Sequence, residues 1–181
     1  MRKIAWLMIS LFLILCLSSC NDVYEETLIS DIREYNEIWT LPERRVDEMS
    51  VLFPNNVDEN QCVSFIGKHT TYHLLGTGWQ ISLEVIYDDM YFSKEIDRLN
   101  NLCANSAICG HSQYFDSPAY ATVWNWNSCF EYAVIDEKEK TICYIYLQLI
   151  EKNDLIIDGK YIPEGYEMQL ANTYSYSVYE K

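Results

Sequence analysis

Two groups of residues in this sequence are of the types that can ligate metal ions. In the first, His69 and His73 stand four positions apart, a spacing that brings two imidazoles to one ion when the segment is helical. The intervening Thr-Thr-Tyr favours a strand, in which the two rings would lie roughly 13 Å apart. Zinc holds its nitrogen ligands at about 2 Å, so we expect no metal site at this pair.

The second group is Cys103, Cys109 and His111. Three ligands fall short of the four of a structural zinc site, and no Cys-x-x-Cys pair supports one. Cys103 and Cys109, six positions apart, can instead form a local disulfide in an oxidising compartment, or remain reduced thiols. Cys109 or Cys129 with His111 would be the nucleophile and base of a thiol enzyme.

The motifs of common enzyme classes are missing from the sequence. It contains no Gly-x-Ser-x-Gly, no phosphate-binding glycine loop, no His-Glu-x-x-His and no Asp-x-Asp-x-Asp-Gly calcium loop. We therefore expect no cofactor and no metal. A hydrolase or thiol enzyme remains an alternative, because catalytic partners meet in space and not in sequence.

Aromatic side chains offer a different chemistry, the recognition of a ligand. The chain has 15 tyrosines and 5 tryptophans, and several rings gather between residues 110 and 127. Such rings pack in half-buried strands, or they form surfaces that stack sugars and hold peptides. The alternation Trp124-Asn125-Trp126-Asn127 would present two rings from one face. The candidate ligand-binding residues are Tyr114, Tyr120, Trp124 and Trp126, with core packing as the alternative.

The first twenty residues carry a chemical signal of another kind. Arg2 and Lys3 precede an apolar run from Ile4 to Leu17, and Leu17-Ser18-Ser19-Cys20 follows. This layout resembles the signal peptide and lipobox of bacterial lipoproteins. The resemblance implies cleavage after residue 19, a lipid on Cys20, and a protein anchored in the cell membrane on its extracytoplasmic face. A retained transmembrane helix is the alternative, but a spanning helix needs about 20 apolar residues, more than this run supplies.

Two short segments beyond the signal carry a further resemblance. Leu52-Phe53-Pro54 and Phe130-Glu131-Tyr132-Ala133 resemble segments of small, uncharacterised lipoproteins of gut Firmicutes. This resemblance implies neither an activity nor any catalytic or binding position.

Three helices are predicted from hydrophobic spacing. Leu28, Ile32, Tyr35 and Ile38 recur at helical intervals, which predicts a helix over residues 28–39. Residues 46–53 suggest a short second helix. Asp88-Asp89 offers an N-cap for a third, which runs to about Leu102 with Phe92, Ile96, Leu99 and Cys103 on one face.

Strands are predicted from alternation. The clearest single strand is 79–87, preceded by a hairpin turn at Gly76-Thr77-Gly78 and a partner strand at 69–75. An apolar patch at 62–66 has no assigned structure. Two more strands are expected at 120–124 and, as an edge strand, at 174–179.

A second hairpin joins residues 130–135 to residues 142–147 through the charged turn 136–140. Centring the turn between Lys138 and Glu139 predicts the pairs Val134–Cys143, Tyr132–Ile145 and Phe130–Leu147 on one face. Cys129 and Cys143 then point to opposite faces and cannot form a disulfide. The other face is expected to be half exposed, and it carries Glu131, Ala133, Tyr144 and Tyr146.

These elements predict an α+β fold, an antiparallel β-sheet with helices packed on one face. The expected organisation is a signal peptide at 1–19, a lipidated N-terminus and short tether at 20–26, and a single domain at 27–181. A net charge of −14 excludes a nucleic-acid partner, because phosphate binding needs clustered Lys and Arg.

Three functions are compatible with this sequence. The first is a non-enzymatic binding module, anchored to the membrane through Cys20, that holds a peptide, glycan or envelope protein. The second is an accessory subunit of an envelope complex, which would expose a contiguous apolar patch. The third is the hydrolase or thiol enzyme.

Overall fold

The computed structural model describes residues 23–38, 51–72, 76–106, 109–124, 129–148, 150, 152–163 and 165–166. Several sequence predictions fall outside these residues. They are the signal peptide 1–19, the lipid site Cys20, His73, Trp126 and the edge strand 174–179.

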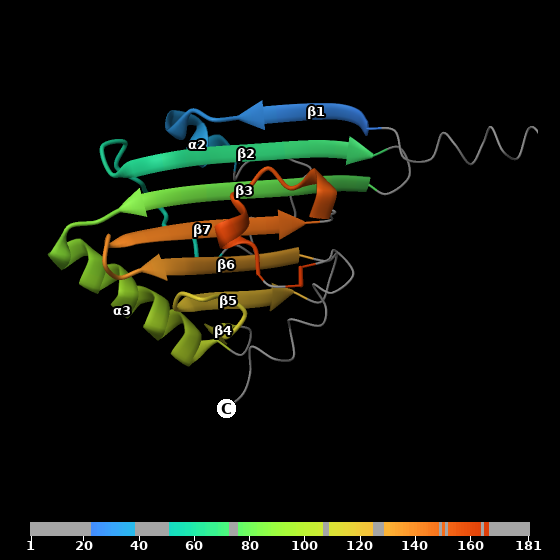
Figure 1. Cartoon of the computed structure of the whole chain (residues 1–181). Coiled ribbons are helices and arrows are strands. Elements are labelled where there is room, and N and C mark those ends of the chain that lie inside the picture. The colour runs from blue at the N-terminus through green and yellow to red at the C-terminus, as the bar shows by residue number, and fades with distance from the viewer. Residues whose placement is uncertain are drawn as a thin grey trace, which may run out of the picture.

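The centre of the fold is one sheet of seven antiparallel strands in the order β1-β2-β3-β7-β6-β5-β4 (Figure 1). Two meanders, β1 to β3 and β4 to β7, meet where β3 pairs with β7. The helix α3 (Asp89–Asn105) runs from the end of β3 to the far edge strand β4. The strands are β1 (Val23–Ile29), β2 (Cys62–Tyr72), β3 (Gly76–Ile86), β4 (Cys109–Ser112), β5 (Ala119–Trp124), β6 (Cys129–Asp136) and β7 (Thr141–Gln148).

Helices cover one face of this sheet, which confirms the predicted α+β class. α3 begins at the predicted N-cap, where the Asp88 carboxylate accepts a hydrogen bond from the N–H of Tyr91 at 2.9 Å. Its apolar stripe is also as predicted, because Leu99 is fully buried and Phe92, Ile96 and Cys103 pack on the same core. The short α2 (Tyr35–Ile38) joins that core through both of its terminal residues.

The second hairpin has the predicted register, with Val134 opposite Cys143 and Phe130 opposite Leu147. Its exposure differs from the prediction. The face expected to be half exposed is fully buried, with relative exposures of 0 to 1% for Glu131, Ala133, Tyr144 and Tyr146. The reason is that this face lies under α3 and residues 51–53, while the C-terminal segment 150–166 covers the other face (Figure 1).

The helix predicted over residues 28–39 is wrong in its first part. Val23–Ile29 is the edge strand β1, paired along β2, and it includes residues 23–26 of the predicted tether. Leu28 is 60% exposed there. Helical turns begin only at η1 (Ile32–Glu34). The helical spacing therefore predicts Tyr35 and Ile38 correctly but not Leu28. For residues 23–29, pairing with the distant strand β2 outweighs the helical period of the apolar residues.

Two smaller predictions are also corrected. Gly76, Thr77 and Gly78 lie within β3, opposite Tyr72, Thr71 and Thr70, so the predicted hairpin turn at these residues is wrong, and residues 73–75 of the predicted partner strand lie outside the described residues. Val51–Phe53, assigned to a short helix, are not helical, because side chains from β6 and α3 bind their backbone groups. The patch at 62–66 is the start of β2, and β5 contains the strand predicted at 120–124.

Candidate functional site

Of the four aromatic residues predicted to bind a ligand, the two with described side chains, Tyr114 and Tyr120, lie on different faces of the sheet. Tyr120 is only 3% exposed, and its hydroxyl donates to Asn100 Oδ1 at 2.6 Å beneath α3. Tyr114 is half-buried and packs on the core of the opposite face. Trp124 lies on β5, but its side chain, like Trp126, is outside the described residues. Tyr120 and Tyr114 therefore pack on two different faces of the sheet, and ligand binding by the four aromatic residues stays a prediction.

The residues considered above as metal ligands or thiol catalysts are not brought together where the structure describes them, and the side chains of His73 and Cys129 lie outside its described part. Cys103 and Cys109 form a disulfide with a Cα–Cα distance of 4.6 Å, which ties the end of α3 to β4 and withdraws both sulfurs from other chemistry. His111 is exposed and lies over the Tyr120 ring at 4.6 Å between centroids. His69 is on a strand, against the Trp79 ring. Within the described part of the chain, no three metal-ligating side chains come together.

Two described cysteines are free, Cys62 and Cys143. Burial raises the pKa of the Cys143 thiol to about 12, and its sulfur lies 3.5 Å from Ser82 Oγ. Burial, with the nearby Glu84 carboxylate, also raises the pKa of Cys62. Because the thiolate is the reactive form, neither residue is an activated nucleophile.

Among the described residues, Glu131 is the one fully buried charged residue, and its role is structural. Its carboxylate accepts hydrogen bonds from the backbone N–H groups of Val51, Leu52 and Phe53 at 3.1, 2.8 and 3.3 Å, and from the Thr122 hydroxyl at 3.2 Å. A buried carboxylate with this many donors is well satisfied. No sequence signal marks this site, because alternation along the strand predicts a half-exposed Glu131.

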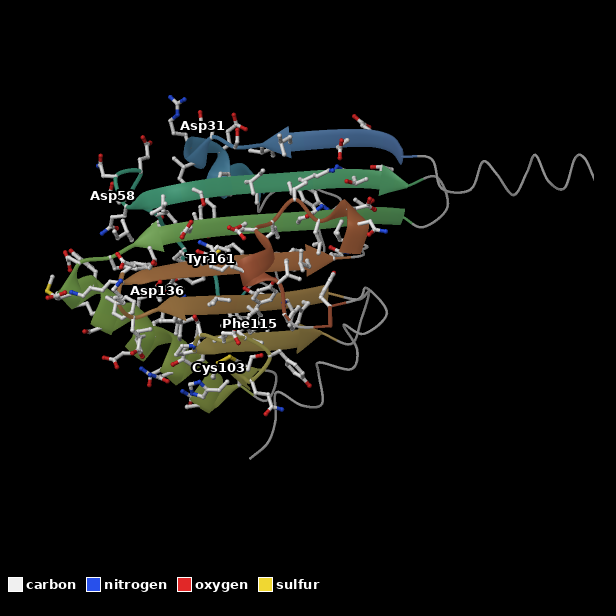
Figure 2. All side chains as sticks on the ribbon, in the orientation of Figure 1. Asp31, Asp58, Cys103, Phe115, Asp136 and Tyr161 are labelled. Atoms are coloured by element: carbon white, nitrogen blue, oxygen red, sulfur yellow. A yellow bond between two sulfur atoms is a disulfide. The ribbon has the colours of Figure 1, made fainter. Side chains whose placement is uncertain are left out.

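A hollow of about 120 Å³ opens on the face opposite α3, where the end of β6 and the start of β7 meet the 3₁₀ helix η3 (Gly159–Tyr161). Figure 2 shows Asp136 at the end of β6 and Tyr161 close by. The hollow has charged, hydroxyl and apolar walls, formed by Ser117, Val134, Ile135, Asp136, Thr141, Cys143, Lys160 and Tyr161.

Polar groups in this hollow keep hydrogen-bonding and ion-pairing capacity that the described residues do not use. Lys160 and Asp136 have opposite charges but form no ion pair with each other or with any other described residue. The hydroxyls of Ser117 and Thr141 have no hydrogen-bond partner within the described ranges. Concave sites with a few convergent polar groups are the usual form of ligand sites in proteins.

The elements around the hollow are held firmly. The Tyr161 hydroxyl donates to Glu84 Oε1 at 2.6 Å, which fixes η3 against β3. η3 begins at Asp158, whose carboxylate accepts from the N–H of Lys160 at 3.0 Å. Hydrogen bonding to Glu84 and burial together raise the pKa of Tyr161, burial being the larger cause, so the phenol stays a donor.

A second hollow lies at the start of α3, lined by Tyr87, Asp88, Asp89, Met90 and Lys140. The charged side chains that line this second hollow already have partners. Lys140 forms an ion pair with Asp89, and Asp88 caps the helix. The hollow at Lys160 is therefore the better candidate for a ligand site.

Comparisons with protein-family models, curated proteins and solved structures found no match to this chain. Among the described residues, no helix is both long and apolar enough to cross a bilayer. The site must be interpreted from its own geometry. In the sequence, Asp136 is predicted to lie in a turn and no pattern marks Lys160, Ser117 or Thr141, because these residues converge only in the folded chain.

Proposed function

We propose that this protein is a lipid-anchored binding protein on the extracytoplasmic face of the cell membrane. The location rests on the lipobox Leu17-Ser18-Ser19-Cys20. The Cys103–Cys109 disulfide is consistent with it, because disulfides persist in oxidising compartments.

The binding role rests on one observation, a hollow in which Lys160 and Asp136 form no ion pair and the hydroxyls of Ser117 and Thr141 form no hydrogen bond within the described chain. Polar groups gathered in a concavity and left unpaired are available to a ligand. The same hollow does not favour catalysis. It contains no histidine, and burial raises the pKa of its only thiol, Cys143, to about 12.

Location is tested with the full-length chain expressed in a bacterial host. Wild type should be processed before Cys20, gain the mass of a diacylglyceryl group and partition into detergent. Cys20→Ala should remain unprocessed and unlipidated, and Cys16→Ala is the matched control, since Cys16 lies within the apolar run. A Cys20→Ala protein that is processed and lipidated normally would exclude the lipobox.

Binding is tested with the mature, detergent-extracted wild type by thermal unfolding against divalent metals, cationic peptides, cell-wall glycans and amino acids. A ligand at 100 times its dissociation constant stabilises the fold by about 2.7 kcal/mol, a readily measured shift. A shift with one class supports the binding role. The absence of a shift with every class, together with a partner recovered by crosslinking in cells, would favour the accessory-subunit alternative.

A further inference from the structure

We infer that the hollow between the β6–β7 hairpin and η3 binds a small zwitterion of the amino-acid type. The ligand carboxylate faces Lys160 and its ammonium faces Asp136. This inference rests on the proposed binding function and names the class of its ligand.

The charges of the hollow carry the argument. Lys160 and Asp136 line one small space, yet they are too far apart to neutralise each other. A ligand with a single charge would pair with one of them and leave the other without a counter-ion. A ligand with both charges pairs with both, and charge-assisted hydrogen bonds are the stronger kind.

Three other described lysines form ion pairs. Lys138 pairs with Glu139 at 3.1 Å, Lys140 pairs with Asp89, and Lys68 pairs with Glu26. The Lys160 ammonium instead lies 4.4 Å from the centroid of the Tyr161 ring, a cation–π contact that leaves its hydrogen-bond donors available. Lys160 differs from these three lysines and resembles Lys94, which lies 5.2 Å from the Tyr91 ring centroid and also forms no ion pair among the described residues.

Asp136 is held in place without being neutralised. Its Oδ1 accepts hydrogen bonds from the N–H groups of Lys138 and Glu139, both at 3.0 Å, and no bond to Oδ2 is found among the described residues. Lys160 lies on η3, which Asp158 caps and the Tyr161–Glu84 bond fixes to the sheet. A ligand would meet two charges on ordered elements, which lowers the entropy lost on binding.

Size and wall chemistry restrict the ligand further. The volume of about 120 Å³ suits a small molecule, and the buried floor includes the side chains of Val134 and Cys143. The hydroxyls of Ser117 and Thr141 can donate or accept at the rim. The chemistry matches a compact zwitterion with a short apolar side chain.

The test is isothermal titration of the mature full-length protein in detergent with defined probes. Glycine, L-alanine and glycylglycine are the zwitterions, acetate and ethylammonium carry single charges, and glycerol carries none. We expect a zwitterion to bind at least about tenfold more tightly than either single-charge probe, the effect of one charge-assisted hydrogen bond.

Two variants remove one charge each and keep the fold. Asp136→Asn retains the Oδ1 acceptor of the turn, and Lys160→Met retains the aliphatic stem over Tyr161. Each should weaken zwitterion binding by about tenfold. Lys138→Gln, a charge change in the adjacent turn, is the matched control and should leave binding unchanged, and thermal unfolding checks that all variants are folded.

The alternative outcomes separate this inference from the proposed function. If acetate binds as tightly as the zwitterions, and only Lys160→Met abolishes this binding, the hollow is a simple anion site. That result would overturn the inference that the ligand is a zwitterion. Zwitterion binding that neither variant weakens would place the ligand elsewhere, overturning the inference while the binding function stands. No zwitterion binding together with a thermal shift from another ligand class would do the same. If no ligand of any class binds, both proposals fail.

Discussion

Glu131 and Leu52 are joined by a buried hydrogen bond between positions 79 apart in the sequence, with the Leu52 N–H donating to Glu131 Oε1 at 2.8 Å. On the other side, the Arg98 guanidinium donates to the carbonyl oxygens of Val51 and Leu52. The backbone at Leu52 is therefore held between strand β6, through Glu131, and helix α3, through Arg98. This short segment connects the helix layer to the sheet.

Replacing the Glu131 carboxylate should destabilise the protein strongly. In Glu131→Gln one acceptor oxygen becomes an NH₂ donor that faces backbone N–H groups, so buried donors lose their partner. We expect a loss of about 2–4 kcal/mol in the free energy of unfolding, measured by urea titration. Glu139→Gln, in an exposed turn, should change it by less than about 0.5 kcal/mol. Equal effects of the two variants would refute the structural role of the carboxylate.

A methyl group at position 67 should overpack the helix-side core. A Cβ added to Gly67 would lie 2.2 Å from Cδ1 of the fully buried Ile38. Gly67→Ala should therefore cost about 1–3 kcal/mol of unfolding free energy. Ile38→Val removes that Cδ1, so adding it to Gly67→Ala should cost less than the sum of the two single changes in a double-mutant cycle. Additive effects would show that Gly67 and Ile38 do not contact each other.

Stability should fall at alkaline pH because of Tyr87. Burial, the largest cause, and the nearby Glu95 raise its pKa from 10.0 to about 12, against a hydrogen bond with Tyr144 that lowers it. The raised pKa favours the neutral phenol in the folded state. Its contribution is complete below pH 10, where the unfolded phenol is also neutral, and is lost as pH rises through 12.

This prediction is tested by measuring the free energy of unfolding at several pH values between about 9 and 12, an interval of about three pH units that includes the titration of the Tyr87 phenol. Wild type should lose up to about 2 kcal/mol more than Tyr87→Phe across it, since the variant lacks the titrating hydroxyl. Parallel pH profiles for the two proteins would mean that Tyr87 titrates alike in the folded and unfolded states.

The Cys103–Cys109 disulfide should stabilise the far edge of the sheet. It joins α3 to β4, whose only strand neighbour in the described sheet is β5. For a loop closed across six positions, the chain-entropy model gives about 2 kcal/mol. Reductant should lower the unfolding free energy of wild type by about that amount and have no effect on the variant Cys103→Ala/Cys109→Ala. A variant that still responds to reductant would point to a different disulfide.

Local pattern was sufficient for the parts of the fold whose contacts are short in sequence. The register of the β6–β7 hairpin follows from alternation on both sides of one turn, as Val134 opposite Cys143 shows. α3 follows from its cap Asp88 and a stripe that places Leu99 in the core. The proposed lipobox is also a linear pattern, and it stays a prediction that the fold does not test.

The sequence alone could not decide what covers each strand. Leu28 fits a helical period, but pairing with β2 makes it an exposed strand residue. Glu131 alternates like a surface residue, yet backbone donors from residues 51–53 bury it. Both outcomes depend on segments distant in sequence, because burial and strand pairing are properties of the whole tertiary structure.

The candidate site also depends on contacts between segments that are distant in the sequence. Asp136 and Lys160 come from a hairpin turn and a 3₁₀ helix that have no local relation in the sequence. They share a hollow because the C-terminal segment returns over β6 and β7 and is fixed there by the Tyr161–Glu84 hydrogen bond. The sequence by itself determined the fold class and the strongest local elements, and it is the whole basis of the proposed anchor signal. Only tertiary packing brought two unpaired opposite charges together, since charge proximity depends on distance in space and not on spacing along the chain.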